Sequence, residues 1–202
     1  MDGSGSKREQ NKQANRAALL EAAQQCFLDQ GYDAACIRDV VRRTELATGT
    51  FYNYFPDKES LFRGILEEHI ADVNARMHEV HRNAPTAEAF IRGAYQALFR
   101  MIAEKPDFFG LLLRNEHTVR SLFKDTIVGL PMRALKDDIR EAVARGIFPR
   151  IDVDLLAAAF YGIGFELGRL LVEQPGNDSE AAAEFATTLL AGGLKALAAT
   201  DP

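Results

Sequence analysis

The chain has 202 residues, of which 47% are hydrophobic and 26% are charged, a composition typical of one or two globular domains with a hydrophobic core. Its 24 Lys and Arg residues are outnumbered by 29 Asp and Glu residues, so the formal net charge is −5. This balance excludes a uniformly basic surface, and any contact with nucleic acid must therefore be local.

No segment is expected to span a membrane, because the longest apolar run, Leu155–Phe165, is eleven residues long and a spanning helix needs roughly 20. The amino terminus has charged and amide residues where a signal peptide needs an apolar stretch, so we expect a cytoplasmic protein. Cys26 and Cys36 do not form a CxxC pair, and both are predicted to be small buried apolar groups.

Apolar residues recur at intervals of three and four along almost the whole chain, which predicts helices. The first helix has an apolar stripe from Leu19 to Phe27 and ends at Gly31, a residue suited to a left-handed helix end. A short second helix follows around Val40, and a third ends before Pro56. Residues 1–56 are therefore expected to form one domain, with residues 1–15 as a partly disordered basic arm.

The rest of the chain, residues 57–202, is expected to form a second helical domain. Its predicted helices begin after Asp57, Asp152 and either Asn177 or Asp178, which can act as amino-terminal caps, and also at Thr86, Pro106 and His117. The helix from 117 to 145 is expected to bend or break near Gly129 and Pro131. The fold class is thus all-α, with about nine helices.

The most informative stretch is residues 37–61, "IRDVVRRTELATGTFYNYFPDKESL". Its apolar positions can form a compact core between two short helices joined by a turn, which is helix-turn-helix geometry. Small polar groups, one glycine, a tyrosine and cations remain for the outer face: Arg38, Thr48, Gly49, Thr50, Tyr52, Asn53 and Lys58. Such a face suits double-stranded DNA, because glycine permits close approach, hydroxyls and ammonium groups bind phosphates, and Asn53 can pair with a base edge.

These residues resemble the TetR family of bacterial transcriptional regulators. The stretches "CFLDQGYDAACIRDVV" and Gly49–Leu61, "GTFYNYFPDKESL", follow the family pattern, although Glu45 stands where the turn commonly begins with glycine. The resemblance implies that Thr48, Gly49, Thr50, Tyr52, Asn53 and Tyr54 lie on the recognition helix. It also implies that Lys58 holds a phosphate and that Arg38 touches DNA.

The resemblance further implies an effector pocket in the second domain, which is rich in bulky apolar residues. A small, largely apolar effector is expected, and no cofactor or metal. The candidate pocket residues are Phe99, Phe109, Leu113, Arg114, His117, Phe123, Phe165, Glu166 and Arg169. His78 and His81 lie three residues apart. Such pairs are usually surface groups, so a structural or solvent role is expected for them rather than metal binding.

The last two predicted helices, Leu155–Leu171 and Ala181–Leu197, are too rich in apolar and small residues for the surface of a monomer. We expect them to form a symmetric homodimer contact, which predicts an inverted-repeat operator. The predicted function is a repressor that an effector releases from DNA. Two alternatives are a ligand-responsive activator and a helical ligand carrier or enzyme without DNA function, although no nucleophile elbow, phosphate loop or paired metal ligands support catalysis.

Overall fold

The computed structural model describes residues 3–123, 129–174 and 176–199, and within these residues it contains ten α-helices and no strand. The all-α fold class is therefore confirmed. The chain forms two compact units. The first comprises Met1–His69 and Leu111–Phe123, and the second comprises Ile70–Gly110 and Lys124–Pro202.

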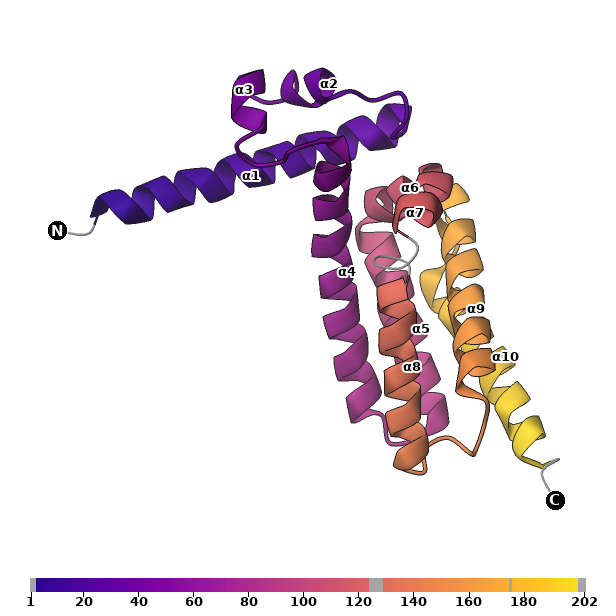
Figure 1. The fold of residues 1–202 in the computed structure, drawn as a ribbon. Helices are drawn as coiled ribbons and strands as arrows, with labels where there is room; N and C mark the ends of the chain where they lie inside the picture. The colour runs from indigo at the N-terminus through magenta and orange to yellow at the C-terminus, as the bar shows by residue number, and fades with distance from the viewer. Residues whose placement is uncertain (1–2, 124–128, 175, 200–202) are drawn as a thin grey trace. The chain divides into compact units, whose positions relative to one another are not determined.

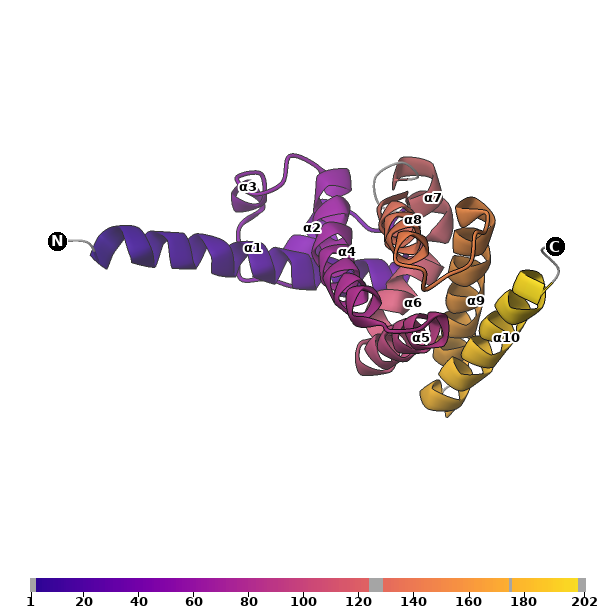
Figure 2. The ribbon, with the colours of Figure 1, turned by 90° about the horizontal axis from the view of Figure 1, so that it is seen from below.

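The first unit is built on a long amino-terminal helix, α1 (Gly3–Gln30), which packs against α2 (Ile37–Val41). In Figures 1 and 2, α1 continues in the amino-terminal direction well past α2 and α3 (Thr48–Phe51). Residues 3–15, expected in part as a disordered arm, thus lie on the same helix as the apolar stripe. Gly31 ends this helix with a φ of 82°, as predicted from its freedom to adopt a left-handed conformation.

An aromatic cluster forms part of the core of the first unit. Phe27 of α1 meets Phe62 of α4 (Lys58–Asn83) edge to face, with ring centroids 5.2 Å apart, and Tyr32 lies 5.1 Å from Phe62. Phe51 and Phe55 are also buried, with centroids 6.0 Å apart. These contacts hold the short helices, which have too few internal hydrogen bonds to be stable alone.

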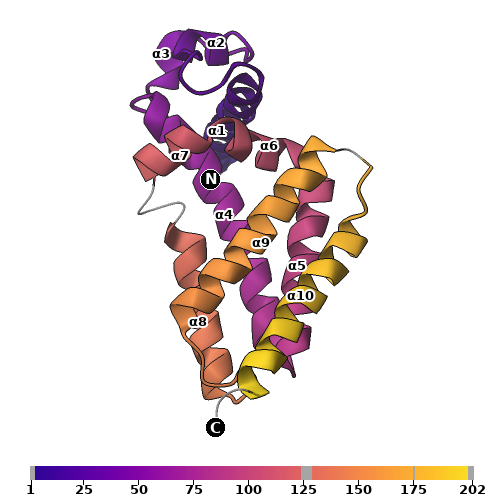
Figure 3. The ribbon, with the colours of Figure 1, turned by 90° about the vertical axis from the view of Figure 1, so that its right-hand side faces the viewer.

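The second unit is a bundle in which α5 (Ala87–Glu104), α8 (Gly129–Ala144), α9 (Val153–Glu173) and α10 (Ser179–Ala199) lie side by side. Figure 3 shows α9 between α8 and α10. The single helix expected over 117–145 is instead α7 (Glu116–Phe123) and α8, which raises the number from nine to ten. The break falls on residues 124–128, outside the described residues, and Pro131 lies in the first turn of α8, where a missing N–H is tolerated.

The predicted helix caps at Asp57, Asp152 and Asp178 are confirmed, and Thr86 caps α5 in the same way. Side-chain oxygens of Asp57, Thr86, Asp152 and Asp178 each accept a hydrogen bond from a backbone N–H in the following turn, with shortest distances of 2.6, 3.1, 2.9 and 2.8 Å. These bonds satisfy N–H groups that have no partner within the helix. Backbone N–H donation from Ser60 also lowers the pKa of Asp57.

Two glycines allow α9 to pack closely within the second unit. A Cβ added to Gly168 would lie 2.7 Å from Ile102 Cδ1, and one added to Gly164 would lie 3.0 Å from Leu98 Cδ2. By length and composition alone α9 is apolar enough to cross a membrane. Its close contacts with α5 instead make it a packed helix of the bundle.

A buried polar cluster lies between α4 and α8 in the second unit. Asp138 accepts hydrogen bonds from Nδ1 of His78 and Nδ1 of His81, both at 2.7 Å. His81 is 3% exposed and stacks on Phe90 with ring centroids 3.8 Å apart. His81 is thus buried, unlike a typical surface pair, and has the structural role that was one of the two expected, because the Asp138 carboxylate gives its ring a charged partner inside the bundle.

Candidate DNA-binding surface

The turn between α2 and α3 is organised by Thr44. Its hydroxyl donates to the Val41 carbonyl at 2.9 Å and accepts from the Leu46 N–H at 3.2 Å. Among the described residues no non-glycine residue has a positive φ, so Glu45 completes this turn without the conformational freedom of glycine. Thr44 is a residue that sequence reasoning missed, although Ser and Thr commonly bond to nearby backbone in turns.

Cys36 and Asp39 cap the start of α2. The Cys36 N–H donates to Asp39 Oδ2 at 3.0 Å, and hydrogen bonds from Cys36 lower the pKa of Asp39. Cys26 is buried as predicted. Cys36 is exposed, so the expectation that it is buried was wrong, because Cys36 is the capping residue just before the first turn of α2. Arg38, in the first turn of α2, is exposed and is thus accessible to a partner.

The segment predicted to read DNA is only partly an α-helix. The α3 helix comprises Thr48–Phe51. Tyr52, Asn53 and Tyr54 follow it in a turn, in which Asn53 N–H donates to the Thr50 carbonyl at 3.1 Å and Tyr54 N–H donates to the Phe51 carbonyl at 2.9 Å. The placement of all six residues on one recognition helix therefore needs correction, because the chain tightens to i→i+3 bonds before Pro56.

This segment separates a polar face from an apolar one. Thr48, Gly49 and Asn53 are exposed, Tyr52 is 56% exposed, and Thr50 and Tyr54 are half-buried. The side chains of Phe51 and Phe55, four residues apart, are buried in the first unit. A Cβ added to Gly49 would meet no other atom within 4 Å. We call the residues from Thr48 to Asn53 the recognition ridge.

Lys58 has an internal role that the sequence did not indicate. Its Nζ donates to the carbonyl oxygens of Tyr32 and Ala35, at 2.8 and 2.9 Å, and lies 4.3 Å from the centre of the Tyr32 ring. An ammonium group has three N–H donors, so two of them close the loop between α1 and α2 and one remains for a phosphate.

The nine candidate effector residues are divided between the two units. Phe99, Phe109, Phe165, Glu166 and Arg169 belong to the second unit, whereas Leu113, Arg114, His117 and Phe123 belong to the first. The Phe123 side chain lies outside the described residues, and Arg114 and His117 are exposed.

Within the second unit the structure brings three of these residues together. The rings of Phe109 and Phe165 have centroids 5.7 Å apart, and the Arg169 guanidinium lies 5.4 Å from the centre of the Phe165 ring. Arg169 also pairs with Glu166 at 3.4 Å. Phe99 is instead fully buried and stacked on Tyr95, which is a core position. The cluster of Phe109, Phe165 and Arg169 thus combines aromatic surface with one cation.

Asn115, between α6 (Pro106–Arg114) and α7, is a further residue that sequence reasoning missed. It is buried, and its Oδ1 accepts from the Tyr32 N–H at 2.6 Å while its Nδ2 donates to the Leu111 carbonyl at 2.8 Å and the Phe27 carbonyl at 3.3 Å. These bonds fasten the segment Leu111–Phe123 to the end of α1 within the first unit. No pattern in the sequence joins positions 83 residues apart.

Two short helices with a buried aromatic face and an exposed polar ridge, attached to a helical bundle, define the class of helix-turn-helix regulators with a separate helical domain. Residues 19–65 match the family model "Bacterial regulatory proteins, tetR family". This match places residues 19–65 in that family and confirms the resemblance seen in the sequence.

Similar proteins include both repressors and activators. The HTH-type transcriptional repressor DhaR of Mycobacterium sp. (strain GP1) is 24% identical over 159 residues, which are 73% of this chain and 79% of that protein. The HTH-type transcriptional activator FasR of Mycolicibacterium smegmatis is 26% identical over 102 residues, 50% of this chain and 47% of that protein. The chain therefore spans about half the length of FasR.

The fold of the whole chain also has solved counterparts. The crystal structure of the transcriptional regulator FadR from Bacillus subtilis, in complex with stearoyl-CoA, is similar with a TM-score of 0.71. The two chains are 19% identical, and the similarity covers 88% of this chain and 98% of that one. The two chains share an architecture, with the helical bundle following the DNA-binding motif.

Proposed function

We propose that this protein is a homodimeric transcriptional repressor that binds an inverted-repeat operator and is released by a small effector with a large apolar part. The observation that carries the proposal is the recognition ridge, where exposed groups on Thr48, Gly49, Tyr52 and Asn53 lie opposite the buried Phe51 and Phe55. Polar groups of this kind can donate to phosphates, and the Asn53 amide can pair with an adenine edge.

Homodimerisation is supported by the outer faces of α9 and α10. On α9 the exposed positions Leu155, Ala158, Gly162 and Leu170 recur at helical spacing, and a Cβ at Gly162 would meet no atom within 4 Å. On α10 the large residues Phe185, Leu189 and Leu197 are exposed. Two copies of this surface can form a four-helix contact around a twofold axis. Two ridges would then face successive major grooves, about 34–36 Å apart.

The proposed effector has an apolar chain and an anionic group. The Bacillus subtilis FadR structure contains stearoyl-CoA, a long-chain ligand with phosphate groups. In this chain the paired rings of Phe109 and Phe165, beside the Arg169 guanidinium, offer both surface types to such a molecule. An effector acts by binding the form of the dimer with low DNA affinity more tightly than the form with high affinity.

Two helices continue from one unit into the other along the chain. Residues of α4 and α6 belong to both units, so a change at Phe109 in α6 has a direct covalent path to Asn115 and its bond with Tyr32. In this proposal the effector shifts that segment and thereby changes the placement of the recognition ridge. The protein would act in the cytoplasm, without any chemical conversion.

Selection from random duplex DNA tests the proposal. The wild-type protein should enrich an inverted repeat at low ionic strength, and Asn53→Ala should relax the preference at one position of each half-site without unfolding the protein, because Asn53 is exposed. Failure to enrich any repeat with folded dimer would contradict the proposed function. Transcription in the presence and absence of the protein then separates a repressor from an activator.

A further inference from the structure

A groove lies between the amino-terminal part of α1 and the turn that follows α3, entirely within the first unit. It has a volume of about 590 Å³ and is lined by Arg8, Glu9, Asn11, Lys12, Asn15, Asn53 and Tyr54. All seven are polar or carry a polar group, so the groove is unsuited to an apolar ligand. Asn53, part of the recognition ridge, forms one of its walls.

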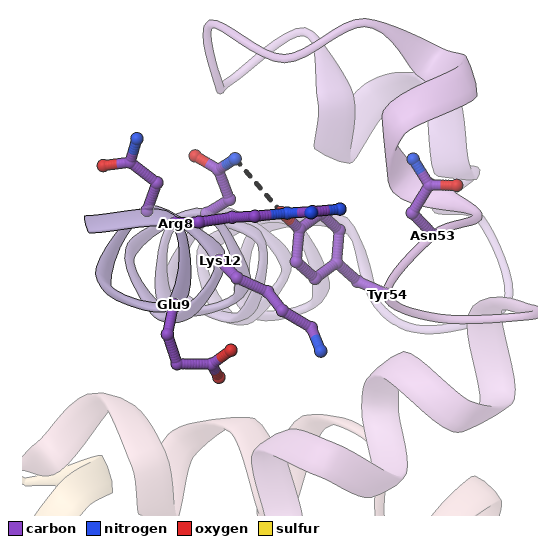
Figure 4. A pocket seen from close by; sticks show the side chains of 7 residues that line it. Arg8, Glu9, Lys12, Asn53 and Tyr54 are labelled. Atoms are coloured by element: carbon purple, nitrogen blue, oxygen red, sulfur yellow. Dashed lines mark hydrogen bonds between the residues drawn. The ribbon is translucent and has the colours of Figure 1, made fainter. Parts of the chain in front are cut away.

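The position of the groove is set by a hydrogen bond. Asn15 Nδ2 donates to the hydroxyl of Tyr54 at 3.1 Å and so joins α1 to the end of the recognition segment. Figure 4 shows this bond, with the Arg8 and Lys12 side chains extending in the direction of Tyr54 while the Glu9 carboxylate points away from it. The two cations therefore line the α1 wall of the groove, opposite Asn53 and Tyr54 of the turn.

The cations of the groove differ from Arg16, one helical turn after Lys12. Arg16 pairs with Glu68 and lies 5.6 Å from the centre of the Phe55 ring, so its charge is used within the unit. Neither Arg8 nor Lys12 has an ion-pair partner among the described residues, and both are exposed. With two cations and one carboxylate, the groove is locally positive on a chain of net charge −5.

We propose that this groove binds the phosphodiester backbone of the DNA that flanks the bases facing Asn53, with Arg8 and Lys12 as the phosphate ligands. The proposal rests on the proposed function and extends it, because it adds a second contact region outside the helix-turn-helix. An unpaired guanidinium and an ammonium four residues apart on one helix can hold neighbouring phosphates. The amides of Asn11 and Asn15 offer additional donors.

The test uses the full-length protein and a selected operator, with Arg8→Gln/Lys12→Gln as the variant. Both positions are exposed and glutamine is a good helix former, so the fold is expected to remain intact. The matched control is Arg100→Gln/Lys105→Gln, which removes the same charge from exposed positions of the second unit. Affinity is measured by fluorescence anisotropy between 50 and 200 mM salt.

For the groove variant, the slope of log affinity against log salt should become smaller in magnitude by about two per protomer, because each lost phosphate contact changes the slope by about 0.9. When salt is raised fourfold, both proteins should lose affinity for DNA. The loss should be about ten times larger per protomer for the wild type than for the variant. Trimming base pairs from both operator ends should weaken the wild type and the control, but leave the groove variant nearly unchanged.

An unchanged slope in the groove variant, or an equal effect of trimming on wild type and variant, would overturn the assignment of Arg8 and Lys12. If the wild type still selects an operator and Asn53→Ala still alters the preference, the proposed function stands without it. A changed base preference at the flanks, in place of a uniform loss, would also overturn it, because phosphate contacts carry no sequence information. If no operator is selected at all, both proposals fail.

Discussion

The recognition ridge and the outer face of α9 and α10 expose opposite kinds of side chain. The ridge exposes polar groups, and the aromatic residues Phe51 and Phe55 on the opposite side of its segment are buried. The two long helices do the reverse at Leu155 and Phe185, which are 71% and 62% exposed. A polar ridge suits a hydrated, charged partner, whereas an apolar face suits a second protein surface. The surface proposed to bind DNA and the surface proposed to form the dimer thus differ in their chemistry.

The largest expected effect comes from a comparison of two glycine-to-leucine substitutions on α9. One lies on the face packed inside the second unit, and the other lies on the exposed face. Gly168→Leu places side-chain atoms where a Cβ alone would be 2.7 Å from Ile102 Cδ1 and 2.9 Å from Phe109 Cζ. We expect the free energy of unfolding to fall by about 3 kcal/mol in urea denaturation, because overpacking forces neighbouring side chains to move.

Gly162→Leu is the matched control, since a Cβ at Gly162 would meet nothing within 4 Å. It should leave the fold intact and instead weaken association, measured by sedimentation over a range of protein concentrations. A normal dimer in Gly162→Leu would contradict the placement of the dimer contact on this face. An unchanged stability of Gly168→Leu would contradict the close packing of α9.

The second effect concerns the attachment of Leu111–Phe123 to the end of α1. Asn115→Ala removes the acceptor for the Tyr32 N–H and the donor to the Phe27 carbonyl. Leaving buried polar groups without partners should cost about 2–3 kcal/mol of unfolding free energy. The adjacent exposed Arg114→Ala should change stability by less than about 0.5 kcal/mol.

Hydrogen exchange gives a local measurement of the same contact. The Tyr32 amide should exchange faster in Asn115→Ala than in wild type, while amides elsewhere in α1 keep their protection. Equal Tyr32 exchange in both proteins would show that Asn115 does not hold this loop. Such a result would also remove the proposed path from α6 to the recognition ridge.

Features set by neighbouring residues were predictable from the sequence. Helical spacing within 37–61 predicts that Phe51 and Phe55 are buried and that Tyr52 and Asn53 face outward, as the structure has them. The contact of these outward residues with DNA stays a prediction. The caps at Asp57 and Asp152 were predicted for the same reason, since a cap acts on the next turn of its own helix.

Contacts between distant segments were not predictable in this way. Asn115 bonds with Tyr32, 83 residues earlier, and Asp138 bonds with His81, 57 residues earlier. Helical spacing predicts which face of a helix is buried but not which helix lies opposite it. The effector site has the same difficulty, because its candidate residues come from α5, α6, α7 and α9.

A third effect tests the polar cluster of the second unit. Asp138→Asn removes the charge that accepts hydrogen bonds from His78 and His81. The expected loss is about 2 kcal/mol of unfolding free energy, typical of a buried hydrogen bond to a charged group. The neighbouring Asp137→Asn, which breaks only an exposed pair with Arg140, should cost less than about 0.5 kcal/mol.

The same cluster predicts a dependence on pH. Burial acts to raise the pKa of Asp138, but hydrogen bonds from His81 and His78 outweigh it and hold the pKa below its ordinary value. A carboxyl with a lowered pKa in the folded state stabilises above its unfolded pKa and loses this effect as the pH falls through the folded pKa. The stability difference between wild type and Asp138→Asn should therefore be full near neutral pH and shrink below about pH 4. A difference that stays constant to lower pH would contradict the role of the charge.

The smallest expected effect separates the two roles of Lys58. Lys58→Met keeps the apolar stem and removes the ammonium that bonds to the Tyr32 and Ala35 carbonyls. Because Lys58 is only half-buried, the free energy of unfolding should fall by about 1 kcal/mol. If the third N–H also binds a phosphate, the salt slope of DNA affinity should become smaller by about one per protomer.

Lys105→Met, at an exposed position of the second unit, is the control and should alter neither measurement. A loss of stability with an unchanged salt slope would make Lys58 a structural residue that closes the loop between α1 and α2. The proposed phosphate contacts of the first unit would then be made by the cations of the groove and by Arg38. Changes in both measurements would instead show that the Lys58 ammonium has both roles. Two of its N–H groups would bond to the Tyr32 and Ala35 carbonyls, and the third would bind a DNA phosphate.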